Sequence, residues 1–431
     1  MAGTVRKKHT AVRLAVMMFL QYGGLGAWSV PLSRWLGTSP TLGGLGFSPS
    51  EIGGIYSTLA IGGLIAPLMT GILADRTFTS EKLLGFLNAL MAVLCVAAGL
   101  WCERHSGMLA SPESAFWPLF GIMLVYCVCI YIGITTATAK TLRNLMNPTS
   151  HFGRVRLIGT LGWVVTVIIA CRLFEPLSSQ PFFVAACSHA LLTLFMPWLP
   201  HTPPLGKGKP LSEVIGLPAI KLFKDPSFVL FIVVAFVTAA MLPFYTVFGN
   251  VCCGSLGIEH PEVKFSTSQI VEMACMFSIP FIVNRIGLKM VMVVGLAAWA
   301  LRNAVFMSVS VPWILLLGIP LQGLAYTYFS IVGSLYIDRE APPHLRAGAQ
   351  SLLTFFASGP GTLTGNYLAG MIVAANTVDH EVIWTNVWLV PAIGCSIITV
   401  VFLLFFHEPK PATTGSPLRG EGSGVRGGPL R

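Results

Sequence analysis

The chain has 431 residues, of which 54% are hydrophobic and only 10% are charged, and its mean hydropathy is +0.75. Soluble globular proteins carry about 25% charged residues, so this composition excludes an ordinary soluble enzyme or nucleic-acid-binding module. The net charge of +10 requires no nucleic acid partner, because proteins with many membrane spans accumulate Lys and Arg in their cytoplasmic loops. The composition predicts a polytopic membrane protein.

In chain order, continuous apolar stretches predict about twelve transmembrane helices, each needing about 20 mainly apolar residues to cross the bilayer. A transmembrane β-barrel would instead show short segments of alternating hydrophobicity. We therefore expect an all-α membrane protein. The expected spans are 13–35, 51–74, 83–102, 115–139, 155–173, 181–199, 227–249, 267–285, 289–309, 312–337, 347–374 and 384–406.

The positions of the basic residues predict the orientation. If the N-terminus is cytoplasmic, the cytoplasmic side holds all but five of the 27 Lys and Arg residues. The exceptions are Arg34, Arg104, Arg172, Lys264 and Arg302. We therefore expect both termini in the cytoplasm and the chain in the cell inner (cytoplasmic) membrane.

The polar connection after the sixth span, His201 to Lys224, divides the spans into two sets of six. This layout is typical of the major facilitator superfamily, whose two halves are parallel repeats. We expect an N-terminal six-helix bundle at 1–199, a cytoplasmic central loop at 200–226, a C-terminal six-helix bundle at 227–406 and a disordered cytoplasmic tail at 407–431.

A short motif follows the second span. Gly71, Asp75 and Arg76 match the G-x-x-x-D-R signature of the major facilitator superfamily. A small residue lets two helices approach closely, and a carboxylate near a helix end can pair with a basic residue in one conformation and release it in another. These three residues are expected to form a conformational latch. The alternative is an ordinary turn with a weak surface ion pair.

Ionisable residues inside spans are costly and therefore mark candidate functional sites. Glu272 is the one carboxylate well inside an apolar run, and Gln269 lies on the same helical face. Glu272 could exchange a proton, and the two side chains could bind hydroxyl groups or the edge of a base. The alternative is a structural acid whose partner is Arg302, which is expected at a similar depth.

Two further groups are candidates for a ligand site. Arg156 and Thr160 share one face of the fifth span, although Arg156 could equally be a membrane anchor. In the tenth span, the polar-aromatic cluster from Tyr326 to Ser330 could stack on a planar ligand or simply pack between helices. The sequence contains no ATP-binding loop, no metal-ligand spacing and no nucleophile–base pattern, so we expect neither a cofactor, nor a bound metal, nor enzymatic activity.

These residues resemble the nucleoside:proton symporters of the major facilitator superfamily. The similarity covers nearly the whole chain and is carried by stretches in both halves. These are Gln21 to Trp28, Ile55 to Asp75, Arg156 to Gly162, Phe248 to Asn250, Ser268 to Glu272, Ala298 to Arg302, Gly333 to Ser334 and Arg346 to Gln350.

The resemblance implies a substrate site, position by position. The family's ligand-contacting arginine and threonine fall on Arg156 and Thr160, and a nearby aromatic falls on Trp163. Its glutamine and glutamate fall on Gln269 and Glu272, and its aromatic on the tenth span falls on Tyr326.

Two departures from the family pattern affect coupling and recognition. The family's carboxylate on the tenth span is replaced by Thr327, and its polar pair on the seventh span becomes Pro243 and Thr246. These changes could alter the substrate, restrict proton coupling to Glu272 or leave a facilitator.

The sequence thus predicts a monomeric transporter that moves a nucleoside and a proton by alternating access. Its substrate would contact Arg156, Thr160, Trp163, Gln269, Glu272, Tyr326 and Thr327, and Glu272 would carry the proton. A sugar or oligosaccharide symporter of the same fold is the nearest alternative. A membrane sensor or scaffold that does not transport is the alternative from another class.

Overall fold

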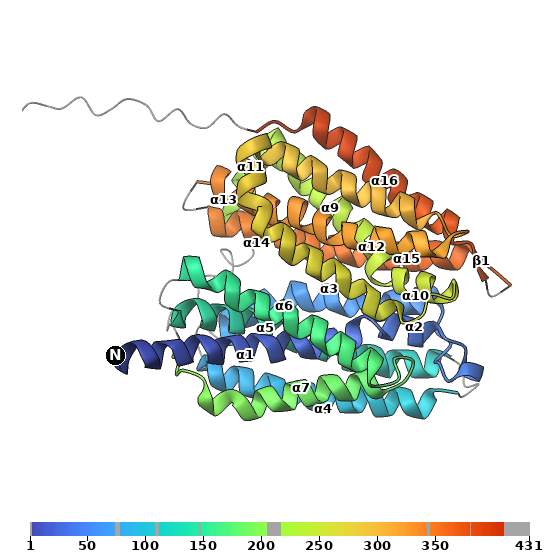
Figure 1. Cartoon of the computed structure of the whole chain (residues 1–431), viewed down its shortest axis with the longest axis horizontal. Coiled ribbons are helices and arrows are strands. Elements are labelled where there is room, and N and C mark those ends of the chain that lie inside the picture. The colour runs from blue at the N-terminus through green and yellow to red at the C-terminus, as the bar shows by residue number, and fades with distance from the viewer. Residues whose placement is uncertain are drawn as a thin grey trace, which may run out of the picture.

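A computed structural model describes residues 2–73, 78–107, 112–145, 148–204, 217–342, 345–379 and 381–408. The lower half in Figure 1 contains the first set of helices, and the upper half contains the second. The lower half comprises α1 (Ala2–Ser29), α2 (Leu32–Gly37), η1 (Pro40–Leu42), α3 (Pro49–Ile72), α4 (Ser80–His105), α5 (Pro112–Asn144), α6 (Pro148–Arg172), α7 (Gln180–Phe195) and η3 (Met196–Trp198).

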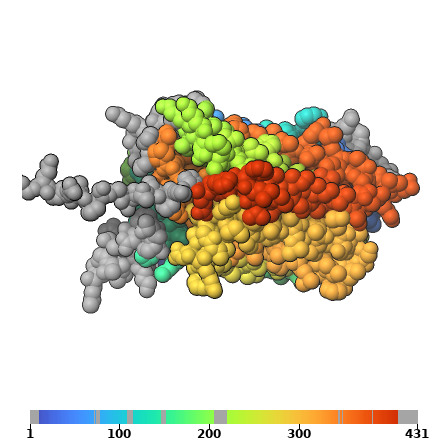
Figure 2. Space-filling view, turned by 90° about the horizontal axis from the view of Figure 1, so that it is seen from above, coloured from blue at the N-terminus to red at the C-terminus, as the bar shows by residue number. Residues whose placement is uncertain are grey.

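The upper half is preceded by the 3-10 helix η4 (Leu217–Lys224). It comprises α9 (Pro226–Thr246), α10 (Phe248–Ser255), α11 (Pro261–Phe306), α12 (Pro312–Tyr326), η5 (Thr327–Ile331), α13 (Val332–Glu340), α14 (Arg346–Phe356), η6 (Ala357–Gly361), α15 (Thr362–Ala375), the hairpin β1 (Thr377–Val378) and β2 (Glu381–Val382), and α16 (Trp384–Phe405). Seen from above, α16 runs lengthwise between α9 and α11 (Figure 2).

Within the described residues, nine helices are long and apolar enough to cross a membrane. One of these, α11, joins the predicted eighth and ninth spans and bends at Gly287, whose φ of 79° is a conformation that glycine adopts without steric cost. The two parts of α11 correspond to two of the predicted spans. Two more predicted spans correspond to α1 and to the continuous helical segment formed by α14, η6 and α15, so each predicted span has a helical counterpart. The structure is thus the all-α membrane fold expected from the sequence.

The residues at the start of α3 favour the beginning of a helix at that point. At the start of α3, Ser48 Oγ accepts from the Glu51 backbone N–H at 3.3 Å, and Glu51 Oε2 accepts from the Ser48 backbone N–H at 2.8 Å. This capping box satisfies donors that the first helical turn leaves without a partner. Pro49 at the first helical position favours the same start.

A buried polar network holds the lower half together. Asn88 Nδ2 donates to Gln21 Oε1 at 3.1 Å, and Asn88 Oδ1 lies 2.8 Å from His189 Nδ1. His189 Nε2 in turn lies 2.9 Å from the Tyr126 hydroxyl. These hydrogen bonds tie α1, α4, α5 and α7 together in the interior of the lower half, although Gln21 Nε2 has no partner among the described residues.

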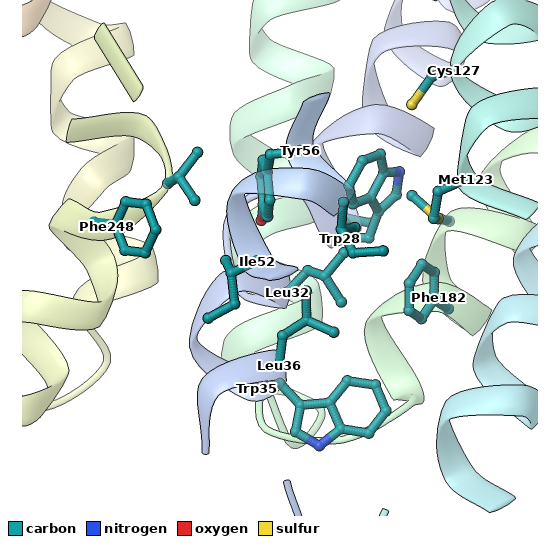
Figure 3. Close-up of a cluster of buried hydrophobic side chains, with 14 of the residues drawn as sticks. Trp28, Leu32, Trp35, Leu36, Ile52, Tyr56, Met123, Cys127, Phe182 and Phe248 are labelled. Carbon is teal, nitrogen blue, oxygen red and sulfur yellow. The ribbon is translucent and has the colours of Figure 1, made fainter. Parts of the chain in front are cut away.

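The two halves are bonded at the end of the molecule that carries α2, α10 and the β1–β2 hairpin, here called the hairpin end (Figure 1). Arg34 Nη1 contacts Glu262 Oε1 at 3.1 Å, and Asn250 Nδ2 donates to the Val30 carbonyl at 3.0 Å. Figure 3 shows the apolar cluster beside this contact, with Phe248 of α10 across from Ile52 and Tyr56 of α3. At the opposite end, α3 and α14 are separated by a cavity of about 210 Å³ that Leu68 and Gln350 help to line.

Candidate functional site

A cavity of about 230 Å³ lies between the two halves and is here called the central cavity. Tyr131 and Trp163 line it from the lower half, and Tyr245, Gln269 and Gln322 line it from the upper half. The lining therefore combines large aromatic faces with two amides, a combination suited to a flat ligand that carries hydrogen-bonding groups at its edge.

Helix α6 places Arg156, Thr160 and Trp163 because its glycines allow a close approach to α1. A Cβ on Gly162 would lie 2.1 Å from the Phe19 carbonyl oxygen, and one on Gly159 would lie 2.9 Å from the Tyr22 ring. Gly159 and Gly162 thus lie on the face of α6 that packs against α1, whereas Arg156, Thr160 and Trp163 lie on a neighbouring face of the same helix.

Arg156 is held in place from two directions. Its guanidinium stacks on the Tyr22 ring, 4.0 Å from the centroid, and its Nη1 donates to Thr160 Oγ1 at 3.3 Å. Arg156 and Thr160 therefore form a connected polar pair, as their spacing of four residues predicts. Both side chains are partly exposed, so the pair remains accessible.

Helix α11 places Gln269 and Glu272 through an equally close contact with α12. A Cβ on Gly323 would lie 2.1 Å from the Ser268 carbonyl oxygen and 2.5 Å from the Glu272 nitrogen. The two backbones therefore pack directly against each other at the turn that carries the acid. Gln269 lines the central cavity, and Glu272 is partly buried one turn further along.

Glu272 and Arg156 approach from opposite halves of the molecule. The carboxyl group lies within electrostatic range of the guanidinium, and Tyr326 lies within range of both. Among the described residues, the ion pairs within 4.0 Å do not include this one. The two charges are therefore not neutralised by direct contact with each other in this conformation.

The alternative in which Arg302 is the partner of Glu272 does not hold, although Arg302 is a structural residue. Arg302 is buried, and its Nη2 donates to Asn303 Oδ1 at 2.7 Å, while its Nη1 donates to Gln322 Oε1. Its guanidinium also lies 4.5 Å from the centroid of the Tyr245 ring. A similar depth in the membrane does not fix the direction in which a side chain points around the helix axis. The Arg302 side chain points toward α12.

The two residues predicted on the tenth span separate in the structure. Tyr326 is 38% exposed and lines a second cavity of about 300 Å³ inside the upper half. Thr327 is fully buried, and its hydroxyl donates to the Glu272 carbonyl oxygen at 3.4 Å. Thr327 thus anchors the backbone beside Glu272 and, unlike the sequence expectation, presents no exposed group to a ligand.

The remaining predicted positions are placed as follows. Thr246 lines the central cavity, although its hydroxyl donates to the Leu242 carbonyl at 3.4 Å, and Pro243 is buried within α9. Of the predicted latch, Gly71 belongs to α3, whereas Asp75 and Arg76 lie outside the described residues.

Sequence reasoning missed three residues of this region: Tyr22, Tyr131 and Gln322. Aromatic residues are common in apolar helices, so Tyr22 and Tyr131 carried no distinguishing signal. Gln322 is an amide inside an apolar span, and that rarity alone could have identified it.

The arrangement can be compared with known proteins. Residues 8–411 match the family described as nucleoside H+ symporters. The chain belongs to this family. It is therefore a multi-pass membrane transporter of nucleosides, and its family is one of transporters.

Two similar proteins align with this nucleoside H+ symporter family member over almost the full length of each sequence. The putative nucleoside transporter YegT of Escherichia coli strain K12 is 31% identical, over 93% of this chain and 94% of the relative. The xanthosine permease of the same organism is 29% identical, over 93% of this chain and 97% of the relative.

Solved structures agree with this assignment. The crystal structure of a mutant of the nucleoside transporter NupG superposes with a TM-score of 0.83 at 25% identity, covering 92% of this chain and 100% of that one. A peptide transporter of the POT family matches with a TM-score of 0.69 at 13% identity, which reflects a shared fold alone.

Proposed function

We propose that this chain carries nucleosides together with protons across the cell inner membrane by alternating access, as a monomer with both termini in the cytoplasm. The observation that supports this most is the approach of Arg156 and Glu272 from opposite halves, beside the cavity lined by Trp163 and Gln269. The named relatives of the chain carry or are expected to carry nucleosides.

In this proposal, Arg156, Thr160, Gln269 and Glu272 hydrogen-bond the nucleoside, and Trp163 and Tyr326 contact its rings. Hydroxyl groups of a ribose suit an amide and a carboxyl, because both can accept the hydroxyl protons. Trp163 offers a flat face for a base. Thr327 supports this arrangement indirectly through the Glu272 backbone.

Glu272 is proposed as the proton site. A charged carboxyl group in a low-dielectric membrane interior is costly, and protonation removes that cost. Arg156 lies close enough to stabilise the charged form in one conformation. Movement of the halves would change that stabilisation and so link proton binding to transport.

With the N-terminus in the cytoplasm, the hairpin end faces outward. The hydrogen bonds between halves that the structure shows for the described residues lie at this end. The conformation is then closed to the outside, with the halves parted toward the cytoplasm beside Leu68 and Gln350.

The test is uptake of radiolabelled uridine and adenosine into proteoliposomes, with and without an inward proton gradient. We expect the gradient to drive accumulation by the wild type, and Glu272→Gln to lose this stimulation while still exchanging nucleoside across the membrane. Glu381→Gln in the exposed hairpin is the matched control and should accumulate nucleoside normally. Undiminished gradient-driven uptake by Glu272→Gln would refute the coupling role, and competition by free sugars alone would favour a sugar carrier.

A further inference from the structure

Gln322 of α12 lines the central cavity while being only 8% exposed. Its Oε1 accepts a hydrogen bond from Trp299 Nε1 at 2.9 Å and a second one from Arg302 Nη1. Two side chains of α11, in the same half of the molecule, therefore hold the Gln322 amide in one orientation.

The orientation of this amide follows from chemistry. An indole N–H and a guanidinium are both donors and have no accepting atom, so the atom of Gln322 that faces them must be the oxygen. Nε2 makes no hydrogen bond within the described part of the chain, and it is not among the fully enclosed polar atoms that lack a partner. Gln322 thus has a single accessible polar group, its NH₂, on the cavity side.

Arg302 adds charge to this arrangement. It is 1% exposed, and its partners in the described residues are the Asn303 and Gln322 amide oxygens and the Tyr245 ring. A cation bound to an amide oxygen draws electrons from the amide nitrogen and so strengthens its N–H donors. Among the described residues, no carboxylate forms an ion pair with this buried guanidinium, so its charge polarises the Gln322 amide that lines the cavity.

Gln269 provides a contrast in the same cavity. Its side chain makes no hydrogen bond with the described residues, so its amide can rotate to present either the oxygen or the nitrogen. Of the two amides that line the cavity, Gln269 can adapt to a ligand and Gln322 cannot.

We propose that Gln322 is a specificity-determining residue, a fixed donor that selects nucleosides whose base presents a carbonyl oxygen over those that present an exocyclic amino group. An amino group opposite the Gln322 NH₂ would leave two donors facing each other without an acceptor, which is costly in a buried site. This inference rests on the proposed nucleoside transport and adds a substrate preference to it.

Two pairs of nucleosides test the effect, because the members of each pair exchange an exocyclic carbonyl oxygen for an amino group, together with the proton on the adjacent ring nitrogen. Uridine is compared with cytidine, and inosine with adenosine, by uptake into proteoliposomes at equal concentrations. We expect the wild type to favour the oxo member of at least one pair by about tenfold, the value of one buried hydrogen bond.

Gln322→Leu should bring this ratio close to one, because it removes the donor. Gln322→Glu should invert the ratio, because one carboxylate oxygen still accepts from Trp299 and Arg302 while the other now accepts from an amino group. Gln269→Leu should weaken both members of each pair to a similar extent. Size-exclusion chromatography in detergent shows which variants are folded, and Gln322→Glu keeps the inner acceptor if Gln322→Leu misfolds.

The possible failures are distinguishable. If the wild type transports none of the four nucleosides, the proposed function fails. If it transports them without preference, or if folded Gln322→Leu and Gln322→Glu keep the wild-type ratio, the role of Gln322 is overturned and nucleoside transport stands.

Discussion

Arg156 shows how a single charged side chain near a membrane surface becomes part of a binding site. By spacing alone it could be an interfacial anchor or a ligand group. The structure places its guanidinium on the face of Tyr22 and against Thr160, which restricts the side chain to one direction. An anchor that simply reaches the lipid headgroups would need neither contact.

Tyr22 should therefore affect transport through Arg156. Tyr22→Leu removes a cation–π contact worth about 1 kcal/mol, so the concentration of nucleoside at half-maximal uptake should rise about fivefold. Tyr22→Phe keeps the aromatic face and should stay close to the wild type. Uptake kinetics of both variants check this, and equal behaviour of the two would contradict it.

At the same scale, the sequence predicted which residue types matter better than it predicted their partners. Glu272 stands out because an acid in an apolar run is rare and costly. Arg302, the alternative partner, bonds to Asn303 and Gln322 instead, because similar depth in the bilayer does not define the direction of a side chain around the helix axis. Gln322 acquires its proposed role only through Trp299 and Arg302, which no local pattern connects to it.

At the scale of elements, helix α12 crosses α11 at a point where no side chain separates the two backbones. Gly323 is that point, and it determines how close the tenth span lies to Gln269 and Glu272. The π-helical segment η5 begins four residues later at Thr327, whose hydroxyl bonds to the Glu272 carbonyl. Such single-turn π segments are frequent at functional sites.

Gly323→Ala should lower the melting temperature of the purified protein and reduce uptake. An alanine in a helix is intrinsically favourable by about 1 kcal/mol relative to glycine, but the new Cβ would overlap the α11 backbone at a cost of about 1–3 kcal/mol. Gly121→Ala in α5 is the matched control, because a Cβ there meets nothing within 4 Å. Its melting temperature should be unchanged or higher.

The spans themselves were largely predictable, and the departures from prediction have local causes. Two expected spans are joined in the single bent helix α11, because the backbone departs from helical geometry only at Gly287. The eleventh span contains the π-helical segment η6 with Pro360, which the apolar pattern does not reveal. Hydropathy reports how long a segment is and says little about its internal geometry.

At the scale of the whole molecule, polar contacts between the halves gather at the hairpin end. Glu262 is fully buried there, and Arg34 of α2 is its ion-pair partner at 3.1 Å. Asn250 of α10 also reaches across to Val30. Because one half must separate from the other during alternating access, this contact should stabilise the conformation that is closed at this end.

Glu262→Gln should shift the equilibrium toward opening at the hairpin end. The probe is a cysteine at Ser29, which lines the central cavity, labelled in intact cells with a membrane-impermeant maleimide. We expect labelling to become about tenfold faster, the change that corresponds to about 1.4 kcal/mol. The same cells without Ser29→Cys give the background from native cysteines.

Glu259→Gln is the control for this experiment, because Glu259 is exposed and three residues away. It should label at the rate of the parent protein. An unchanged rate in Glu262→Gln would show that the ion pair does not hold the halves together, and the carrier would then depend on apolar contacts such as those around Phe248.

The sequence by itself determined that this chain crosses a membrane many times, that it divides into two halves and that an acid lies inside a span. These properties follow from the lengths of apolar segments and from the cost of charge in the bilayer, both of which are local. Only the tertiary structure decided that Arg156 stacks on Tyr22, that Arg302 turns to Gln322 and that the hairpin end is closed. These depend on helix rotation and close backbone contact, which arise from packing between segments distant in the chain.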